Sequence, residues 1–259
     1  MQRMISTFLF NLYFVSTVLA VPIGIGAKIG MSRNKTVWSE SVFQIVNRIQ
    51  EDICIGKMCT TIGEGFASGT AFVVGYSEGR TVFMSAAHLC NEFDVWESNP
   101  DNVSQTKRSS HMYIAHEEDL HEAGKMILYK NTGNDICIFL VEKKFGRKLK
   151  IAKNSPSYAE QIWTIGAPAG FFPESAKPIN SGYFSGKAIR FDSDDQDIEF
   201  YNFSLATKQG MSGSPIMTAN GRVVGIVSAV HSEWHMICFS PTLAQIIEAH
   251  GIALQSLDR

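Results

Sequence analysis

The sequence predicts an all-β protein, and three features of the chain support this. Short runs of apolar and β-branched residues recur along the chain, with turn residues between them. Helical periodicity does not separate these runs, as it would in a protein of alternating strands and helices. The composition also suits a folded domain, since 45% of the 259 residues are hydrophobic and 19% are charged.

Residues 1–30 are predicted to be a signal peptide or a membrane anchor. Arg3 precedes an uncharged stretch over 4–27, and Val18-Leu19-Ala20 fits a small-x-small cleavage site. The stretch is about long enough to span a bilayer, but polar residues dilute it, which favours a cleaved signal. Either interpretation predicts an extracytoplasmic protein, secreted or anchored through its N-terminus, with no other membrane contact.

The remainder, 41–250, divides into two blocks of strands. In the first block, 41–150, strands are expected at 41–46, 70–75, 81–85 and 135–141, of which the middle two form a hairpin. The polar stretch 91–125 is interpreted as surface loops around one weak strand. In the second block, 158–240, a strand at 161–166 ends in a Gly-Ala-Pro-Ala-Gly turn, and further strands are expected at 182–189, 199–206, 222–230 and 235–239.

One helix is predicted, over 241–250. Ser240 can cap it and Pro241 suits its first turn. Its apolar stripe consists of Leu243, Ile246 and Ile247, and Gly251 can end it.

The cysteines and the charge exclude several classes of protein. Five cysteines cannot all pair within one chain, and without a C-x-x-C motif neither a zinc ribbon nor a thioredoxin-like site is indicated. Cys54 and Cys59 are close enough to bridge a hairpin, whereas Cys90, Cys137 and Cys238 are interpreted as small buried residues. A net charge of −2 without a basic run makes nucleic acid a poor partner.

Three segments together carry the chemistry. Ser85-Ala86-Ala87-His88 comes first, Asn134-Asp135-Ile136-Cys137 second, and Gly210-Met211-Ser212-Gly213-Ser214-Pro215 third. A serine hydroxyl needs a base to take its proton, and the imidazolium that forms needs a carboxylate. We therefore predict Ser212 as nucleophile, His88 as base and Asp135 as the orienting acid. The backbone N–H groups of Gly210 and Ser212 are predicted to form an oxyanion hole. This chemistry needs neither a metal nor an organic cofactor.

On these segments the chain resembles the chymotrypsin-clan serine proteases, and most closely the Deg/HtrA-type protease domain without its PDZ domain. Further resemblance lies at 68–73, 165–170, 181–186 and 225–228. The resemblance implies two perpendicular six-stranded antiparallel barrels with the active site between them. It implies a serine endopeptidase that cleaves polypeptides through an acyl-enzyme, in which Ser228 hydrogen-bonds Asp135.

The resemblance also implies a specificity pocket, with Ala206 and Thr207 at its base and Ala229 and Val230 on its wall. No carboxylate stands at its base, and Val230 narrows it, so a small or medium apolar P1 residue is expected. His231 and His235 could instead favour an acidic P1 residue. Met211 stands where digestive enzymes have an activating aspartate, and their disulfide near the histidine is not carried over to this chain.

Other functions fit the sequence less well than this one. An α/β-hydrolase is excluded because its G-x-S-x-G elbow is absent and its acid and histidine would follow the serine. A metalloprotease is excluded because His116 and His121 are five residues apart, not the four that H-E-x-x-H requires. With His111 nearby, a surface metal site is a minor alternative to a solvated loop. A catalytically inactive protease-fold binding or scaffold protein is the main alternative.

Overall fold

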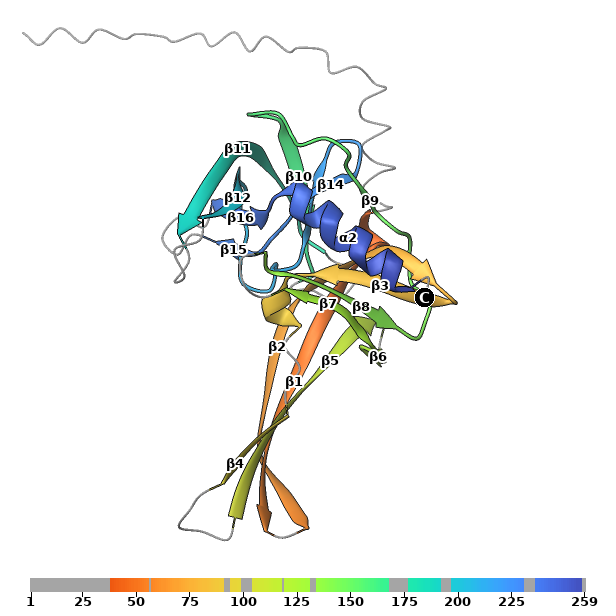
Figure 1. The fold of residues 1–259 in the computed structure, drawn as a ribbon, viewed down its shortest axis with the longest axis vertical. Helices are drawn as coiled ribbons and strands as arrows, with labels where there is room; N and C mark the ends of the chain where they lie inside the picture. Colours follow the sequence, from red (N-terminus) through yellow and green to blue (C-terminus); the bar gives the residue numbers. More distant parts are fainter. Residues whose placement is uncertain are drawn as a thin grey trace, which may run out of the picture.

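Two β-sheets and a C-terminal helix form the described part of the chain (Figure 1). The computed structural model describes residues 38–55, 57–90, 94–98, 104–117, 119–130, 134–167, 177–191, 197–230 and 236–257. The predicted all-β class is confirmed. Within the residues described, each sheet contains eight strands where six were expected.

The N-terminal sheet has the order β4-β5-β1-β2-β3-β8-β7, and β6 pairs with β5. Its strands are β1 (Val42–Ile55), β2 (Met58–Ser77), β3 (Arg80–Ser85), β4 (Asp94–Ser98), β5 (Ser104–His116), β6 (Asp119–Glu122), β7 (Met126–Lys130) and β8 (Ile136–Val141). A short 3₁₀ helix, η1 (Ala87–Leu89), follows β3.

The C-terminal sheet has the order β15-β16-β12-β11-β10-β13-β14-β9. Its strands are β9 (Lys150–Ile151), β10 (Gln161–Ile165), β11 (Ile179–Phe191), β12 (Asp197–Ser204), β13 (Pro215–Thr218), β14 (Arg222–Ile226), β15 (Ala229–Val230) and β16 (Ile237–Pro241). All of its pairs are antiparallel except that of β14 with β9.

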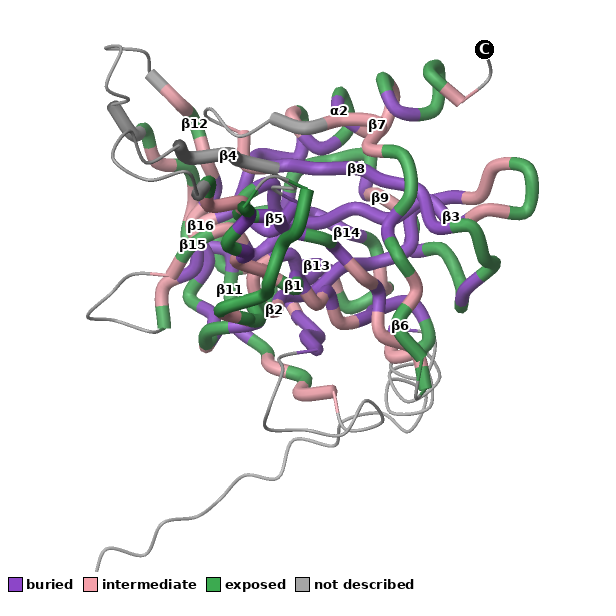
Figure 2. Tube along the Cα trace, turned by 90° about the horizontal axis from the view of Figure 1, so that it is seen from below, coloured by how far each residue is buried: buried purple, intermediate pink, exposed green. Residues whose placement is uncertain are grey.

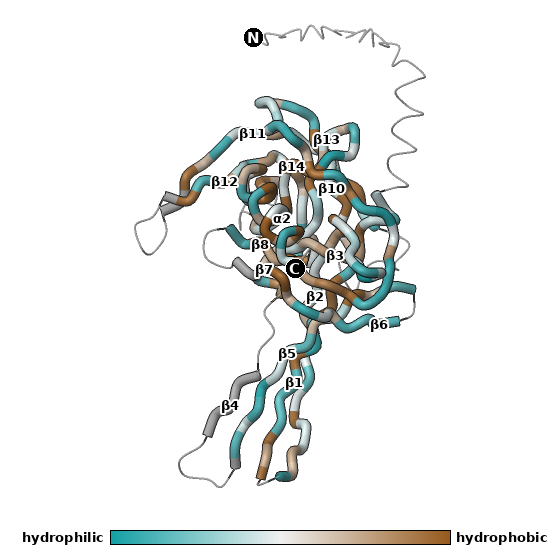
Figure 3. Tube along the Cα trace, turned by 45° about the vertical axis from the view of Figure 1, so that its right-hand side comes forward, coloured by the Kyte–Doolittle hydropathy of each residue, from teal (hydrophilic) through white to brown (hydrophobic). Residues whose placement is uncertain are grey.

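A long arm of strands projects from the body of the molecule (Figure 1). It consists of β1, the first half of β2, β5 and β4. The prediction of surface loops over 91–125 was wrong here, because β5 pairs with β1 without interruption from Ser104 to Ala115. Polar β5 residues form this ladder through backbone groups, which a hydrophobic pattern does not report. Figure 2 shows the arm in front of the largely buried body, and Figure 3 shows hydrophobic residues near its tip.

The core fills the space within and between the two sheets. Within the N-terminal sheet, Phe83 packs edge-on against Phe43 and stacks with Phe139, with ring centroids 5.5 and 5.6 Å apart. Phe83 is fully buried, which contributes roughly 1.5–3 kcal/mol relative to an exposed side chain. A second cluster joins the two sheets, since it contains Met84 from β3 and Ile226 from β14. This shared core fixes one sheet against the other.

The terminal helix, α2 (Leu243–Leu257), differs from the prediction at both ends. Thr242, not Ser240, caps it: the Gln245 N–H faces the Thr242 hydroxyl, and the Gln245 side chain accepts from the Thr242 N–H. This is a capping box, with Ser240 still in β16. The helix continues through Gly251, because the apolar face beyond it, including Ala253, packs into the core. Within the described residues, no helix is long and apolar enough to span a membrane.

Candidate active site

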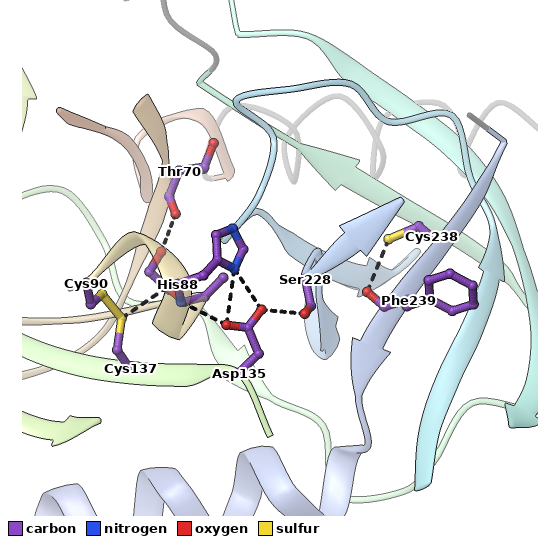
Figure 4. A network of polar contacts seen from close by, with 10 residues as sticks. Thr70, His88, Cys90, Asp135, Cys137, Ser228, Cys238 and Phe239 are labelled. Atoms are coloured by element: carbon purple, nitrogen blue, oxygen red, sulfur yellow. Dashed lines mark hydrogen bonds and ion pairs between the residues drawn. A yellow bond between two sulfur atoms is a disulfide. The ribbon is translucent and has the colours of Figure 1, made fainter. Parts of the chain in front are cut away.

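His88 and Asp135 lie against each other in the N-terminal sheet (Figure 4). His88 is on η1, and Asp135 directly precedes β8. The Nδ1 atom of His88 lies 2.9 Å from Oδ2 and 3.1 Å from Oδ1 of Asp135. The backbone N–H of His88 also donates to Oδ1, at 2.9 Å. The carboxylate therefore holds both the position of the turn and the orientation of the ring, which leaves Nε2 as the outward nitrogen.

Backbone geometry directs this carboxylate. Asp135 has a φ of 40°, in the left-handed region that Asp tolerates better than most residues. Its carbonyl accepts a hydrogen bond from the Ala87 N–H at 3.1 Å. The hydroxyl of Ser228 donates to Oδ2 from the C-terminal sheet side. Asp135 is thereby bonded from both halves of the molecule, and its side chain is 20% exposed against 41% for His88.

Cys90 and Cys137 are buried, as expected, but they are also joined by a disulfide, which the interpretation as small buried residues did not include. Cys90 lies two residues after His88, and Cys137 lies two residues after Asp135. The bond therefore clamps the turn that carries the imidazole to the strand that carries the carboxylate. The pairing was missed because no sequence feature shows that η1 lies over β8. Cys54 and Cys59 are also joined, while Cys238 is free and buried, and its burial raises the pKa of the thiol.

Ser212 stands at the corner of the second of two consecutive turns. In the first turn the Met211 N–H donates to the Lys208 carbonyl, and in the second the Ser214 N–H donates to the Met211 carbonyl, both at 3.0 Å. Gly210 and Gly213 are the third residues of these turns, with φ of 87° and 83°. A positive φ at that position defines a type II turn, which favours glycine. The Gly-x-x-Gly spacing is thus explained by backbone geometry.

Thr70 on β2 connects this loop to the N-terminal sheet. Its N–H donates to the Ser212 carbonyl at 2.8 Å, and its hydroxyl donates to the Gly210 carbonyl at 3.0 Å. The same hydroxyl accepts from the Ala167 N–H at 3.0 Å. Thr70 is fully buried. Thr70 is not among the predicted site residues, although a threonine at the start of an otherwise apolar strand is a usable signal in the sequence.

The loop that carries Ser212 also lies against the segments that carry Ser228 and His88. Gly213 N–H donates to the Val227 carbonyl at 2.7 Å, next to Ser228. A side chain at Gly213 would collide with the Thr70 carbonyl and the hydroxyl of Ser85. Since Ser85 lies three residues before His88, Ser212 sits in the same junction between the sheets as the His88–Asp135–Ser228 network.

The predicted pocket residues lie beside this junction on the C-terminal sheet. Ala206 and Thr207 follow β12, where the Asn180 side chain donates to the Ala206 carbonyl at 2.8 Å. The Thr207 hydroxyl is buried and has no partner within the described part of the chain. Ala229 and Val230 form β15, paired with β16. His231, His235 and residues 168–170 lie outside the described residues.

The His116–His121 segment is not a solvated loop. The ring of His116 packs on Phe43 and Phe145, and that of His121 on Phe145, with centroids 5.1 to 5.6 Å apart. Among the described residues, no group of three His, Cys, Asp or Glu side chains is placed to hold a metal ion.

Comparison with known proteins agrees with this architecture. A family model for a trypsin-like peptidase domain matches residues 69–226. The Rv3671c protease from M. tuberculosis in its active form is 17% identical, with a TM-score of 0.58 over 95% of this chain and 94% of that one. A serine endoprotease from Yersinia pestis is 13% identical, with a TM-score of 0.57 over 87% of this chain and 66% of that one.

No curated protein matches the sequence. The sequence identities to the solved structures, 17% and 13%, are low and indicate a shared fold only. The family model, in contrast, spans more than half of the chain and all three candidate segments. The chain therefore belongs to the family of trypsin-like peptidase domains.

Proposed function

We propose that this protein is a serine endopeptidase that acts through Ser212, His88 and Asp135. The observation that carries the proposal is the hydrogen bonding of His88 Nδ1 to a carboxylate that Ser228 also binds. That bonding fixes the tautomer in which Nε2 is the proton acceptor. Ser212 comes from the loop held between Thr70 and Val227, beside this network.

In the proposed reaction, the Ser212 hydroxyl attacks the scissile carbonyl while His88 takes its proton. Asp135 stabilises the resulting imidazolium. The tetrahedral intermediate carries its negative charge next to the N–H groups of Gly210 and Ser212. His88 then protonates the leaving amine, an acyl-enzyme forms on Ser212, and water releases the acid product by the reverse sequence.

The Gln209–Gly210 peptide supports the proposed oxyanion hole. Type I and type II turns differ by a flip of their central peptide, and that peptide carries the Gly210 N–H. The φ of 87° at Gly210 selects the type II form. The hydrogen bond that the Thr70 hydroxyl donates to the Gly210 carbonyl holds the next peptide, between Gly210 and Met211, in place. A donor fixed before the substrate arrives costs no reorganisation during the reaction.

The substrate is a polypeptide with a small or medium apolar P1 residue. This part of the proposal depends on Ala206, Thr207, Ala229 and Val230, none of which is charged. One methylene in such a pocket changes discrimination by only about 1–3 kcal/mol, so cleavage should be selective but not strict. A cleavage profile on a peptide library tests it, and dominant cutting after Lys, Arg or Glu would reject it.

We further propose that the domain works outside the cytoplasm. The two disulfides suit an oxidising compartment, and the apolar N-terminal segment suits export. Mass spectrometry of the mature N-terminus would distinguish a cleaved signal from a retained anchor.

An active-site fluorophosphonate tests the catalytic assignment directly. It should label the wild-type protein at Ser212 and should not label Ser212→Ala or His88→Ala. Ser214→Ala is the matched control, because it changes a serine in the same loop that has no proposed role in the chemistry. Folded wild-type protein that never reacts would favour the inactive binding or scaffold alternative.

A further inference from the structure

A cleft outside the proposed active site lies where the segment that joins the two sheets meets α2 and the start of β14. Figure 1 shows that β9, β14 and α2 lie close together. The volume of the cleft is about 470 Å³, within the range of roughly 300–1,000 Å³ found for small-molecule sites. The cleft shares no residue with the proposed triad or pocket, so it is a separate candidate site.

Basic side chains line this cleft. They are Lys148, Lys150, Lys153, Arg222 and His250, and no acidic residue is among the described residues that line it. The three lysines and the arginine are exposed. Within the described part of the chain, none of these four forms an ion pair. The cleft therefore holds uncompensated positive charge, which favours a negatively charged ligand.

The fold itself brings two of these charges together. Lys150 on β9 pairs with Arg222 on β14, and neighbouring strands lie about 4.8 Å apart. Exposed Lys148 and Lys150 alternate with buried Leu149 and half-buried Ile151, so both lysines face outward. Like charges on paired residues of neighbouring strands are destabilising. An anion bound between them would remove that repulsion.

The net charge of the chain conceals this cluster. Residues 143–153 contain six lysines or arginines and no aspartate or glutamate, although the whole chain carries a formal charge of −2. Apolar residues interrupt the cluster, so it does not stand out as a continuous basic run. The expectation of no membrane contact beyond the N-terminal segment rests on the charge of the whole chain, whereas a ligand responds to the local charge of its site.

An aliphatic wall lies beside the basic residues. Val74 and Leu149 line the cleft and are each 4% exposed, and Ile247 on α2 lines it with 43% of its surface exposed. Leu254, also exposed, lies two turns further along the same face of α2. Among the described residues that line the cleft none is aromatic, so it lacks the stacking platform that nucleic-acid sites use for bases. The lining therefore suits an anion that carries an aliphatic chain.

The basic residues favour phosphate over carboxylate as the anionic group. The guanidinium of Arg222 presents a planar set of donors that fits two phosphate oxygens, and each lysine adds a compact positive charge. A phosphate monoester carries about 1.5–2 negative charges at pH 7, whereas a carboxylate carries one. Phosphate therefore balances the four cations of the cleft more completely.

From these observations we propose that the cleft binds a phosphate group attached to an aliphatic chain, with the phosphate between Lys150, Lys153 and Arg222 and the chain along Ile247. The headgroup of an anionic phospholipid and a soluble phosphate ester share this chemistry. The ligand would contact the N-terminal sheet through Val74, the C-terminal sheet through Arg222, and α2, so it would stabilise the folded protein by mass action. The proposal goes beyond the catalytic one and does not depend on it.

Isothermal titration calorimetry of the full chain with inorganic phosphate and with octyl phosphate tests the site. Octyl phosphate, below its micelle-forming concentration and at about 0.15 M salt, should bind about tenfold or more tightly than inorganic phosphate. Each fully buried methylene contributes about fourfold to affinity. Octyltrimethylammonium has the same chain and the opposite charge, and it should not bind. The proposal fails if octyl phosphate binds no better than inorganic phosphate or no better than the ammonium compound.

Variants of the basic residues test the position of the phosphate. Lys150→Ala and Arg222→Ala should each weaken the binding of octyl phosphate about fivefold or more. Lys144→Ala is the matched control and should change the affinity less than about twofold. Lys144 belongs to the same basic segment, but it lies over the ring of Tyr76, 5.5 Å from the centroid, and does not line the cleft. Circular dichroism checks that the variants are folded, and wild-type affinity in all three would contradict the site.

A second pair of variants tests the position of the aliphatic chain. Ile247→Ala should lower the ratio of octyl phosphate affinity to inorganic phosphate affinity about threefold or more. It should leave the affinity for inorganic phosphate unchanged. Ile252→Ala is the control, because this side chain lies on the same helix with a similar exposure, 37% against 43%, and does not line the cleft. Equal ratios in the two variants would contradict the placement of the chain along Ile247.

Vesicles distinguish the two sources of the phosphate. If vesicles of phosphatidylglycerol and phosphatidylcholine in equal parts sediment the wild-type protein better than Arg222→Ala, and pure phosphatidylcholine vesicles do not, the ligand is a phospholipid headgroup. If octyl phosphate binds and the vesicles do not distinguish the two proteins, the ligand is a soluble phosphate ester. If a single-stranded oligonucleotide binds more tightly than octyl phosphate and displaces it, the cleft is part of a nucleic-acid surface and the proposal is wrong.

Discussion

The hydroxyl of Thr70 donates a 3.0 Å hydrogen bond to the carbonyl of Gly210, across 140 residues of sequence. One side chain of the N-terminal sheet thereby holds the loop that carries the proposed oxyanion hole. The bond is fully buried, and the same oxygen accepts from the Ala167 N–H. Thr70 is therefore a positioning residue for the proposed chemistry.

Thr70→Val should lower kcat by about tenfold with little change in KM. Valine has nearly the same shape as threonine, but it leaves the Gly210 carbonyl and the Ala167 N–H without their hydrogen-bond partner. Each unpaired buried group costs about 1–3 kcal/mol. Steady-state kinetics on a short peptide measure the split between kcat and KM. Thr70→Ser should restore most of the rate, and a valine variant with wild-type kcat would show that the bond is dispensable.

Gly210→Ala should lower kcat by about 10²–10³, the usual effect of losing one oxyanion-hole donor. Alanine at φ of 87° costs roughly 1–2 kcal/mol, which favours a flip of the Gln209–Gly210 peptide. The matched control is Gly186→Ala, a substitution at φ of 110° in β11, where an added side chain would meet no atom within 4 Å. If kcat falls by the same factor in both variants, the effect at Gly210 comes from general backbone strain.

Removal of the Cys90–Cys137 disulfide should destabilise the protein by about 2–4 kcal/mol and reduce activity. The bond closes a separation of 47 residues and ties the His88 turn to the Asp135 strand. Thermal unfolding and peptide hydrolysis of the Cys90→Ala/Cys137→Ala variant measure the two effects. The Cys54–Cys59 disulfide closes a separation of only five residues, far from His88. Its removal should therefore affect stability and activity much less.

The stability of the protein should decrease on mild acidification, partly because of His250. Burial lowers the pKa of this imidazole on α2, and nearby Lys148 lowers it further. An unfolded histidine titrates at about pH 6.5 and so binds protons more readily than the folded one. The contribution of neutral His250 is therefore fully present above about pH 6.5 and is lost as the pH falls below it.

Urea unfolding between pH 7.5 and 5 measures this effect. The free energy of unfolding of His250→Gln should fall less over that range than that of the wild type. Parallel curves for the two proteins would mean that His250 does not contribute to the acid sensitivity.

Local patterns were sufficient for part of the fold. The buried strand at 136–141 and the hairpin of β2 with β3 follow from runs of apolar residues, and the structure contains both. The 13-residue strand β5 could not be predicted in this way, because it is polar and gains its order from backbone pairing with β1. The helix was expected to stop at Gly251, but packing of Ala253 into the core outweighs the poor helix propensity of glycine.

By itself the sequence determined the residue types of the proposed site and their order, since His88, Asp135 and Ser212 stand in recognisable segments. It also determined the two glycines that the turns around Ser212 require. Only the tertiary structure decided that Cys90 pairs with Cys137 and that Thr70 holds the Gly210 carbonyl. These are contacts between residues far apart in the chain. Their geometry depends on how two sheets pack, and no local periodicity encodes that.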